Sequence, residues 1–331
     1  MTDAVAAALL VGVVAYAVFG GADFGAGFWD LTAGGAERGR RPRALIDHSL
    51  GPVWEANHTW LIYCLVVLWT AFPDAFAAIM TTLYIPLGLA VLGIVLRGSA
   101  FAFRKVVVRT EHQRVNGAMF ALSSVITPFF FGTVIGGIAS GRVPTEGHGD
   151  ALRSWMNPSS ITTGVLAVAV CAYLAAVFLT ADAHRTADAE LLVWFGRRAT
   201  LTAALTGVVA ATDLLIAHHD APRLFDQLTS KALPFTVASA AAGLAALALM
   251  RGGNPVLVRV LAGAAVAALV SGWGVAQYPY LLGTHARLDE VAAPSASMVS
   301  LLVVTGVAAA LIGPSFVLLY VLQQRDTLGD H

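Results

Sequence analysis

The sequence predicts an all-α integral membrane protein with about nine transmembrane helices, and three observations lead to this fold class. Of its 331 residues, 57% are hydrophobic and only 12% are charged, and the charged share is about half that of a soluble domain. The mean hydropathy is +0.74. Apolar runs of about 20 residues, the length with which a helix crosses the hydrocarbon core, recur along the whole chain. A bilayer removes this much apolar surface from water, whereas a single soluble core cannot.

Nine apolar runs define the predicted spans: 4–29, 52–72, 76–96, 115–139, 161–180, 199–217, 233–250, 259–278 and 298–321. No linker rich in serine or glycine and no repeat of about 20 to 50 residues divides them, so residues 1–331 are expected to form a single polytopic membrane domain. The first ten residues carry neither a basic segment nor a cleavage site and are expected to begin the first span. Pro86, Pro128 and Pro314 lie inside apolar runs and are expected to kink them. Asp74 is expected to be the N-cap of the third span.

Lysine and arginine are divided unequally between the two sides of the membrane. If nine spans alternate in direction, fifteen of the 20 basic residues fall on one side and five on the other. The side with fifteen consists of segments 30–51, 97–114, 181–198, 251–258 with Arg259 at its edge, and the C-terminal tail. Basic loops resist translocation, so this side is expected to be cytoplasmic. The N-terminus is then outside and the C-terminus is cytoplasmic.

Asp23 is an ionisable residue inside the first predicted span. Such a group costs a few kcal/mol or more unless it is paired, hydrated or neutralised. Helical spacing places Gly12, Tyr16, Gly20 and Gly27 on the same face as Asp23. A second helix can approach a glycine-bearing face closely, so the carboxylate is expected to point into the bundle. Two interpretations stay open: a structural hydrogen bond to a neighbouring helix, or a place in a proton or ion path.

A second polar cluster occupies residues 45–61. Glu55 and His58 are three residues apart, which on a helix is close enough to hydrogen-bond and exchange a proton. If the segment is helical throughout, Asp47 shares their face. Alternatively the span begins at Pro52, and 45–51 is an interfacial segment.

These polar residues suggest a proton path from the cytoplasm, through Asp47 and His48 to Glu55, and then through His58 to Asp23. The alternative is a capping cluster at the level of the lipid headgroups. Trp60 lies one turn into the apolar part of the second span, deeper than an interfacial tryptophan belt explains. Gln277 and Tyr278, at the end of the eighth span, are most simply interfacial.

The sequence contains no pattern typical of a metal or haem site. Cys64 and Cys171 each lie inside an apolar run, and no CxxC motif or Cys/His cluster is present. Of the nine histidines only His58 falls within a predicted span, whereas haem in a bundle needs axial ligands at depth, often in facing pairs. We therefore expect no metal, no haem and no catalytic residue in this chain. The expected surroundings are the lipid bilayer and membrane partners, with no nucleic acid.

Several motifs resemble those of subunit II of the cytochrome bd-type quinol oxidases. The main ones are GGADFGAGFWDL at 20–31 and IDHSLGPVWEANHTWL at 46–61, which is followed by LWTAFPDAF at 68–76. LRGSAFAFRK at 96–105 and AQYPYLL at 276–282 support them. The string W-E-x-N-x-x-W on a second span, after a DFG-like first span, is specific, and the likeness covers essentially the whole chain.

The resemblance implies a bacterial plasma-membrane complex that oxidises quinol and reduces dioxygen to water. Haem b, haem d and the quinol-oxidising loop would lie on subunit I. This chain would be its haem-free partner of the same fold, and small single-helix subunits are further candidates. The resemblance also implies proton delivery through Asp23 and Glu55 and an oxygen path near Trp60. In some members a quinone is also bound structurally.

Two positions depart from the pattern of some relatives, which carry acids where this chain has Gly20 and Ala102. A proton path through those acids cannot run identically here. A rival interpretation is a proton-coupled secondary transporter with Asp23, Glu55 and His58 as coupling residues. A transporter would more often show paired inverted halves, whereas the polar residues here concentrate in the first two spans. A third interpretation is a structural scaffold in which the carboxylates only hold helices together.

Overall fold

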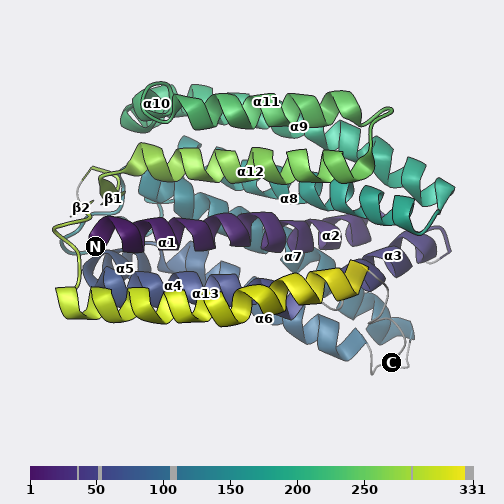
Figure 1. Cartoon of the computed structure of the whole chain (residues 1–331), viewed down its shortest axis with the longest axis horizontal. Helices are drawn as coiled ribbons and strands as arrows, with labels where there is room; N and C mark the ends of the chain where they lie inside the picture. Colours follow the sequence, from purple (N-terminus) through teal and green to yellow (C-terminus); the bar gives the residue numbers. More distant parts are fainter. Residues whose placement is uncertain (36, 51–53, 105–109, 285, 325–331) are drawn as a thin grey trace.

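The computed structural model describes residues 1–35, 37–50, 54–104, 110–284 and 286–324. These residues are mostly helical (Figure 1). The helices are α1 (Thr2–Ala15), α2 (Gly21–Thr32), α3 (Arg40–Leu50), α4 (Trp54–Ala71), α5 (Pro73–Thr82), α6 (Tyr84–Arg104), α7 (Thr110–Ala139), α8 (Pro158–Arg185), α9 (Ala189–Asp220), α10 (Pro222–Leu228), α11 (Leu233–Leu249), α12 (Pro255–Gln277) and α13 (Ser295–Gln324). Two short antiparallel strands, β1 (Tyr280–Leu282) and β2 (Ala286–Arg287), form a hairpin between α12 and α13.

Six helices in the described part of the chain are long and apolar enough to cross a membrane: Thr2–Thr32, Gly117–Ala139, Pro158–Arg185, Ala189–Asp220, Pro255–Gln277 and Ser295–Leu319. The number rises to eight if each of two bent pairs counts as one span. These pairs are α4 with α5, bent by 117°, and α10 with α11, bent by 74°. In α6 the apolar part, Tyr84–Ala100, is shorter. The count of nine spans therefore stays a prediction, as does the single polytopic domain.

The long helices run side by side, and their connections lie at two opposite ends of the bundle (Figure 1). The N-terminus, α10 and the β1–β2 hairpin lie at one end, whereas α3, the α11–α12 connection and the end of α13 lie at the other. This second end carries the arginine-rich segment 37–43. The N-terminus and the end of α13 thus lie at opposite ends of the bundle, but which end faces the cytoplasm stays a prediction.

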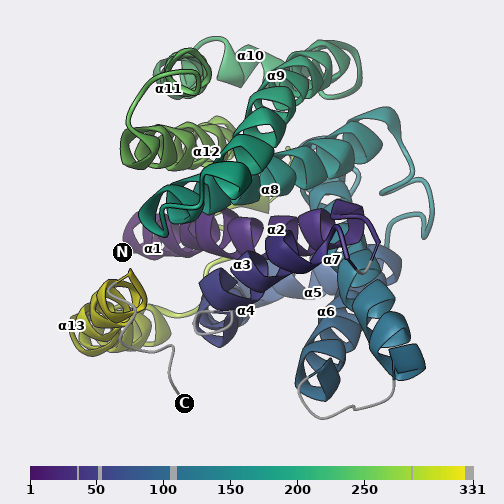
Figure 2. The same ribbon diagram turned by 90° about the vertical axis from the view of Figure 1, so that its right-hand side faces the viewer.

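The first long helix, α1 and α2, lies between two groups of helices. Figure 2 shows α8, α9, α11 and α12 on one side of it and α4, α6 and α13 on the other. Each group has its own cluster of buried apolar side chains: one is built around α8, and the other around α4, α5 and the hairpin. Polar groups on α1 and α2 are therefore shielded from two directions.

The predicted third span, 76–96, is wrong as a single helix. The chain bends sharply after Ala71 and α5 begins at Pro73, where the fixed φ of proline suits the first turn of a helix. The N-cap is Phe72, so Asp74 lies in the first turn of α5 and is not the predicted cap. A new helix starts at Tyr84, which places Pro86 in its first turn, where proline is tolerated without a kink.

The other prolines of the predicted spans can be compared with the structure only in part. Pro128 and Pro314 lie inside α7 and α13, as expected. Pro52, the expected alternative start of the second span, lies outside the described residues, as does the junction at 51–53 that would decide whether 45–61 is one helix.

Close contact of α2 with α8 depends on a glycine that the sequence analysis passed over. A Cβ atom on Gly25 would overlap the main-chain carbonyl oxygen of Cys171 in α8. Main chain cannot turn aside as a side chain does, so only glycine allows this approach. At Gly21 on the same helix, the nearest atom to an added Cβ belongs to the Leu174 side chain, at 3.4 Å.

We therefore predict that Gly25→Ala pushes α2 from α8 and destabilises the protein by about 1–3 kcal/mol, as overpacked cores do. The measurement is the thermal unfolding midpoint of the purified protein in detergent. Gly21→Ala is the matched control and should unfold at nearly the wild-type temperature. Equal midpoints for the two variants would contradict the proposed backbone contact.

Candidate functional site

Asp23 forms a buried ion pair with Arg97 of α6. Asp23 is 1% exposed and Arg97 is 2% exposed. One guanidinium nitrogen of Arg97 donates to Oδ1 of Asp23 at 2.7 Å and to the main-chain oxygen of Asp23 at 2.9 Å. Another donates to the hydroxyl of Ser124 on α7. The guanidinium also lies over the rings of Phe24 and Phe120, at 5.0 and 4.4 Å from their centroids. Arg97 thus balances the charge of Asp23 and ties α2 to α6 and α7.

The sequence analysis missed Arg97 as a site residue because it assigned the segment 97–114 to a basic loop. That assignment is wrong for 97–104, which belongs to α6. The arginine therefore cannot be counted among the fifteen loop residues that set the orientation. Arg97 directly follows an apolar run and is itself followed by GSAFAF. This continuation of small and apolar residues is the signal that could have placed it inside the helix.

A glycine makes room for the ion pair. Gly27 lies one turn beyond Asp23, and a Cβ atom on it would overlap the Ser124 hydroxyl and lie 3.0 Å from a guanidinium nitrogen of Arg97. Gly12 in α1 likewise allows the ring of Tyr63 in α4 to lie against it. The prediction that the glycine-bearing face of the first helix admits close neighbours is confirmed at both positions.

Two polar atoms near the ion pair are buried without a hydrogen-bond partner among the described residues: Oδ2 of Asp23 and the hydroxyl of Tyr16. Tyr16 begins a π-helical segment, Tyr16–Gly20, which joins α1 to α2. Single π-helical turns occur frequently at functional sites. The Tyr16 hydroxyl lies close enough to Asp23 and Arg97 to interact electrostatically with both charges. Unpaired buried polar atoms of this kind are where proteins usually hold ordered water.

His58 lies beside this site. Its ring centroid is 6.5 Å from that of Tyr16 and 6.0 Å from that of Phe24. Its Nδ1 lies 2.9 Å from the main-chain oxygen of Trp54, one turn earlier in α4. A carbonyl oxygen only accepts, so Nδ1 carries a proton and, in the neutral ring, Nε2 is left as the acceptor. The structure thus packs His58 against Phe24, which follows Asp23 in α2 and whose other contacts include Arg97, the partner of Asp23.

The other predicted proton-path residues lie nearer the surface of this chain. Glu55 is exposed in the first turn of α4. In α3, Asp47 is exposed and His48 is half-buried. They lie toward the arginine-rich end of the bundle, where α3 and the beginning of α4 are found (Figure 1). The proposed order, surface acids first and Asp23 last, agrees with this burial but stays a prediction.

Two arginines of α3 form further ion pairs that hold this helix in place. Arg43 donates to Oδ1 of the buried Asp30 at 2.7 Å and to the Gly34 oxygen at 2.6 Å. Arg41 donates to Asp188 at 2.8 Å. Asp188 is the N-cap of α9, and the hydrogen bond from the Leu191 main-chain N–H lowers the pKa of its carboxyl, with Arg41 adding to the effect. These contacts fix α3 to the ends of α2 and α9.

Trp60 lines an apolar groove between α1, α4, α12 and α13. It is half-buried, and its ring stacks on Phe316 of α13 with 5.5 Å between centroids. The groove has a volume of about 970 Å³, and its lining includes Val11, Val260 and Ile312. Trp60 therefore forms part of the wall of an apolar groove, and its role in an oxygen path stays a prediction.

In the described part of the chain, no three His, Cys, Asp or Glu side chains gather as metal ligands would. The expectation that this chain holds no metal or haem stays a prediction.

The family model described as cytochrome bd terminal oxidase subunit II matches residues 1–323. The "Cytochrome bd ubiquinol oxidase subunit 2" of Bacillus subtilis is 29% identical over 163 residues, which cover 48% of this chain and 47% of the relative. The "Cytochrome bd-I ubiquinol oxidase subunit 2" of Escherichia coli is 26% identical over 181 residues, which cover 52% and 46%. The chain thus spans about half the length of the curated relatives it matches.

A solved structure, that of the bd oxidase from Geobacillus thermodenitrificans, contains a chain of similar fold. The TM-score is 0.77 at 22% identity, and the match covers 97% of this chain and 98% of that one. At this identity the similarity shows a shared fold.

The buried ion pair generates a stability prediction. Arg97→Met should leave the Asp23 carboxylate buried and unpaired, at a cost of about 3–5 kcal/mol. Adding Asp23→Asn to that variant removes the uncompensated charge and should restore part of the loss. Yield and thermal unfolding midpoint of the purified protein measure both. A double variant no more stable than Arg97→Met would refute the pairing.

Proposed function

The chain belongs to the cytochrome bd terminal oxidase subunit II family, and on that premise we propose that it is the haem-free partner of a haem-bearing subunit I. The complex would sit in the bacterial plasma membrane, oxidise quinol and reduce dioxygen to water. Family membership confirms the resemblance inferred from segments 20–31 and 46–61. The observation that carries the further proposal is the buried Asp23–Arg97 pair, with Oδ2 of Asp23 and the Tyr16 hydroxyl left unpaired beside His58.

We propose that this chain conducts protons from the arginine-rich end of the bundle toward Asp23. Glu55 is exposed at that end and lies three residues before His58 on α4, within reach for proton exchange. With Nδ1 of His58 bonded to the Trp54 oxygen, Nε2 would accept the proton and pass it on. Asp47 and His48 on α3 would gather protons at the surface.

Asp23 would act as a fixed acceptor at the inner end of this path. Because Arg97 balances its charge, the buried carboxylate can stay ionised, and it would accept hydrogen bonds from the water that carries the proton. Oδ2 is free of protein donors within the described residues and can accept from water or from Tyr16. Arg97, Ser124 and Gly27 would be positioning residues, since they hold the carboxylate in place.

Tyr16 offers a physical reason for the departure at Gly20. A Cβ atom on Gly20 would lie 2.8 Å from the Tyr16 ring, so the ring occupies the space that a longer side chain would need. We infer that the Tyr16 hydroxyl serves here in place of the acid found at this position in some relatives. Water between the hydroxyl and Asp23 would complete the path.

The sidedness of proton uptake explains why such a subunit is useful. Protons taken from the inside for oxygen reduction, while quinol releases its own outside, build a voltage across the membrane. Moving one elementary charge across 100 mV stores about 2.3 kcal/mol. The groove at Trp60 would supply a dry, apolar path for dioxygen, and the same groove would suit a structural quinone.

The assignment to an oxidase complex is tested by purification in mild detergent. We expect a haem-rich second subunit to co-purify and to show haem d bands in the reduced-minus-oxidised spectrum. A colourless preparation of this chain alone that transports a substrate against a proton gradient would contradict the proposal in favour of the transporter.

The proton path is tested at its exposed entrance. Glu55→Gln should slow quinol-driven oxygen consumption by about tenfold or more, because the amide cannot accept a proton, while haem content and assembly stay normal. Glu37→Gln, an exposed acid at the same end of the bundle, is the matched control and should turn over normally. Wild-type turnover in Glu55→Gln would rule out its role.

The oxygen path is tested by Trp60→Ala, which widens the groove and should change the apparent KM for oxygen more than the KM for quinol. Trp69, on the same helix, is 64% exposed, so Trp69→Ala is the matched control and should leave both constants unchanged. A larger effect on quinol than on oxygen would count against the path.

A further inference from the structure

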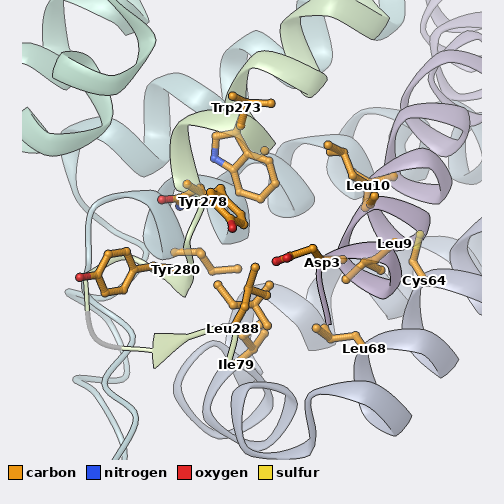
Figure 3. Close-up of a pocket in the computed structure, with 18 of the residues that line it drawn as sticks. Asp3, Leu9, Leu10, Cys64, Leu68, Ile79, Trp273, Tyr278, Tyr280 and Leu288 are labelled. Atoms are coloured by element: carbon orange, nitrogen blue, oxygen red, sulfur yellow. The ribbon is translucent and has the colours of Figure 1, made fainter. Parts of the chain in front are cut away.

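A second cavity lies at the end of the bundle that carries the N-terminus, far from the arginine-rich end. It has a volume of about 460 Å³, within the range of small-molecule sites. The walls come from α1, α4, the end of α12 and the β1–β2 hairpin. Figure 3 shows Leu9, Leu10 and Leu68 on one side, Tyr280 on the opposite side and Trp273 above. None of the residues assigned to the proton path lines this cavity.

Two hydrogen-bond donors of the cavity wall are unused. Nε1 of Trp273 and Nε2 of Gln277 are both buried without an acceptor among the described residues. Gln277 is only 5% exposed, and it lies one turn after Trp273, so both side chains leave the same face of α12. A buried N–H without an acceptor costs about 1–3 kcal/mol. Both residues line the cavity, and a ligand that supplies acceptor oxygens would satisfy the two donors.

The mouth of the cavity carries one charge of each sign. Lys231 and Asp3 are both exposed and both line it. The Lys231 ammonium lies 4.2 Å from the centroid of the Tyr278 ring. Figure 3 shows the Asp3 carboxylate pointing across the cavity toward the side of Tyr278 and Tyr280. A ligand headgroup that carries one anionic and one cationic group could therefore pair its anion with Lys231 and its cation with Asp3.

The body of the cavity is apolar and long. Along α1 its lining extends from Asp3 to Val13, about 15 Å at the rise of a helix. Leu65, Leu68 and Cys64 of α4 line the same stretch. Tyrosine and tryptophan at the mouth are typical of the membrane–water interface, with the apolar part below them. This is the layout of a lipid: charged head, ester carbonyls at interfacial depth and acyl chain beneath.

We propose that this cavity binds one zwitterionic glycerophospholipid with a primary-amine headgroup. Its phosphate pairs with Lys231, its ammonium with Asp3, and an ester carbonyl accepts from Trp273 and Gln277, while an acyl chain follows α1 and α4. A quinone would satisfy the two donors but would leave both charges unmatched. An anionic lipid would place its phosphate beside Asp3 without an ammonium to offset it.

The site is tested on the full chain with its co-purifying subunits. The protein is delipidated and then exposed to vesicles of dioleoyl phosphatidylethanolamine, of dioleoyl phosphatidylglycerol, or of either lipid with ubiquinone. Native mass spectrometry then gives the number of lipid or ubiquinone molecules that each complex retains. We expect one phosphatidylethanolamine to be retained, and its retention to fall about tenfold in the double variant Trp273→Phe/Gln277→Leu. Trp69→Phe, on an exposed face of α4, is the control and should retain the lipid.

A second variant keeps the proposal falsifiable if the double variant fails to assemble. Asp3→Asn alters only an exposed side chain and should abolish the preference for phosphatidylethanolamine over phosphatidylglycerol. Equal retention in wild type and double variant, preferential retention of phosphatidylglycerol or of ubiquinone by the wild type, or an unchanged preference in Asp3→Asn would each overturn the proposal. None of these results depends on oxidase activity, so the proposed function is tested separately.

Discussion

The ion pair between Asp23 and Arg97 is the interaction on which the structure of this chain depends. A carboxylate at that depth is tolerated only when its charge is balanced, and Arg97 balances it from a helix that is 74 residues away in sequence. The same guanidinium holds Ser124, so a single side chain joins α2, α6 and α7. Because residue 27 is glycine, there is space beside α2 for the Ser124 hydroxyl and the Arg97 guanidinium.

The ion pair also determines which polar atoms at this site are left to take part in proton transfer. A balanced carboxylate stays in place, and its second oxygen and the Tyr16 hydroxyl are the polar atoms left to receive a proton or a water. The π-helical segment that begins at Tyr16 brings its side chain next to Gly20, which explains why a larger residue is not accommodated there. His58 joins the same group from α4. Of the predicted proton-path acids, Asp47 and Glu55 are exposed at the surface, whereas Asp23 is buried inside the bundle.

Hydrophobicity predicted the helices well wherever one helix crosses the bundle without interruption. The runs 161–180 and 199–217 lie within α8 and α9, and 259–278 lies within α12 except for its last residue, because the thickness of the hydrocarbon core dictates their length. It failed inside the run 76–96, where α5 ends at Thr82 and a separate helix, α6, begins at Tyr84. Arg97 was missed because a loop assignment weighs each basic residue alone, whereas its partner can be seen only in three dimensions. A hydrogen bond from Asp23 to a neighbouring helix was one of two interpretations that the sequence left open, and the sequence did not identify Arg97 of α6 as the partner.

The central claim, that Asp23 is held as a carboxylate by Arg97, is tested most directly by infrared difference spectroscopy between the wild-type protein and Asp23→Asn. We expect the variant to lose the stretching bands of an ionised carboxylate. Loss of the carbonyl band of a protonated carboxylic acid instead would show that Asp23 is neutral, and it would contradict the ion pair at the centre of this structure.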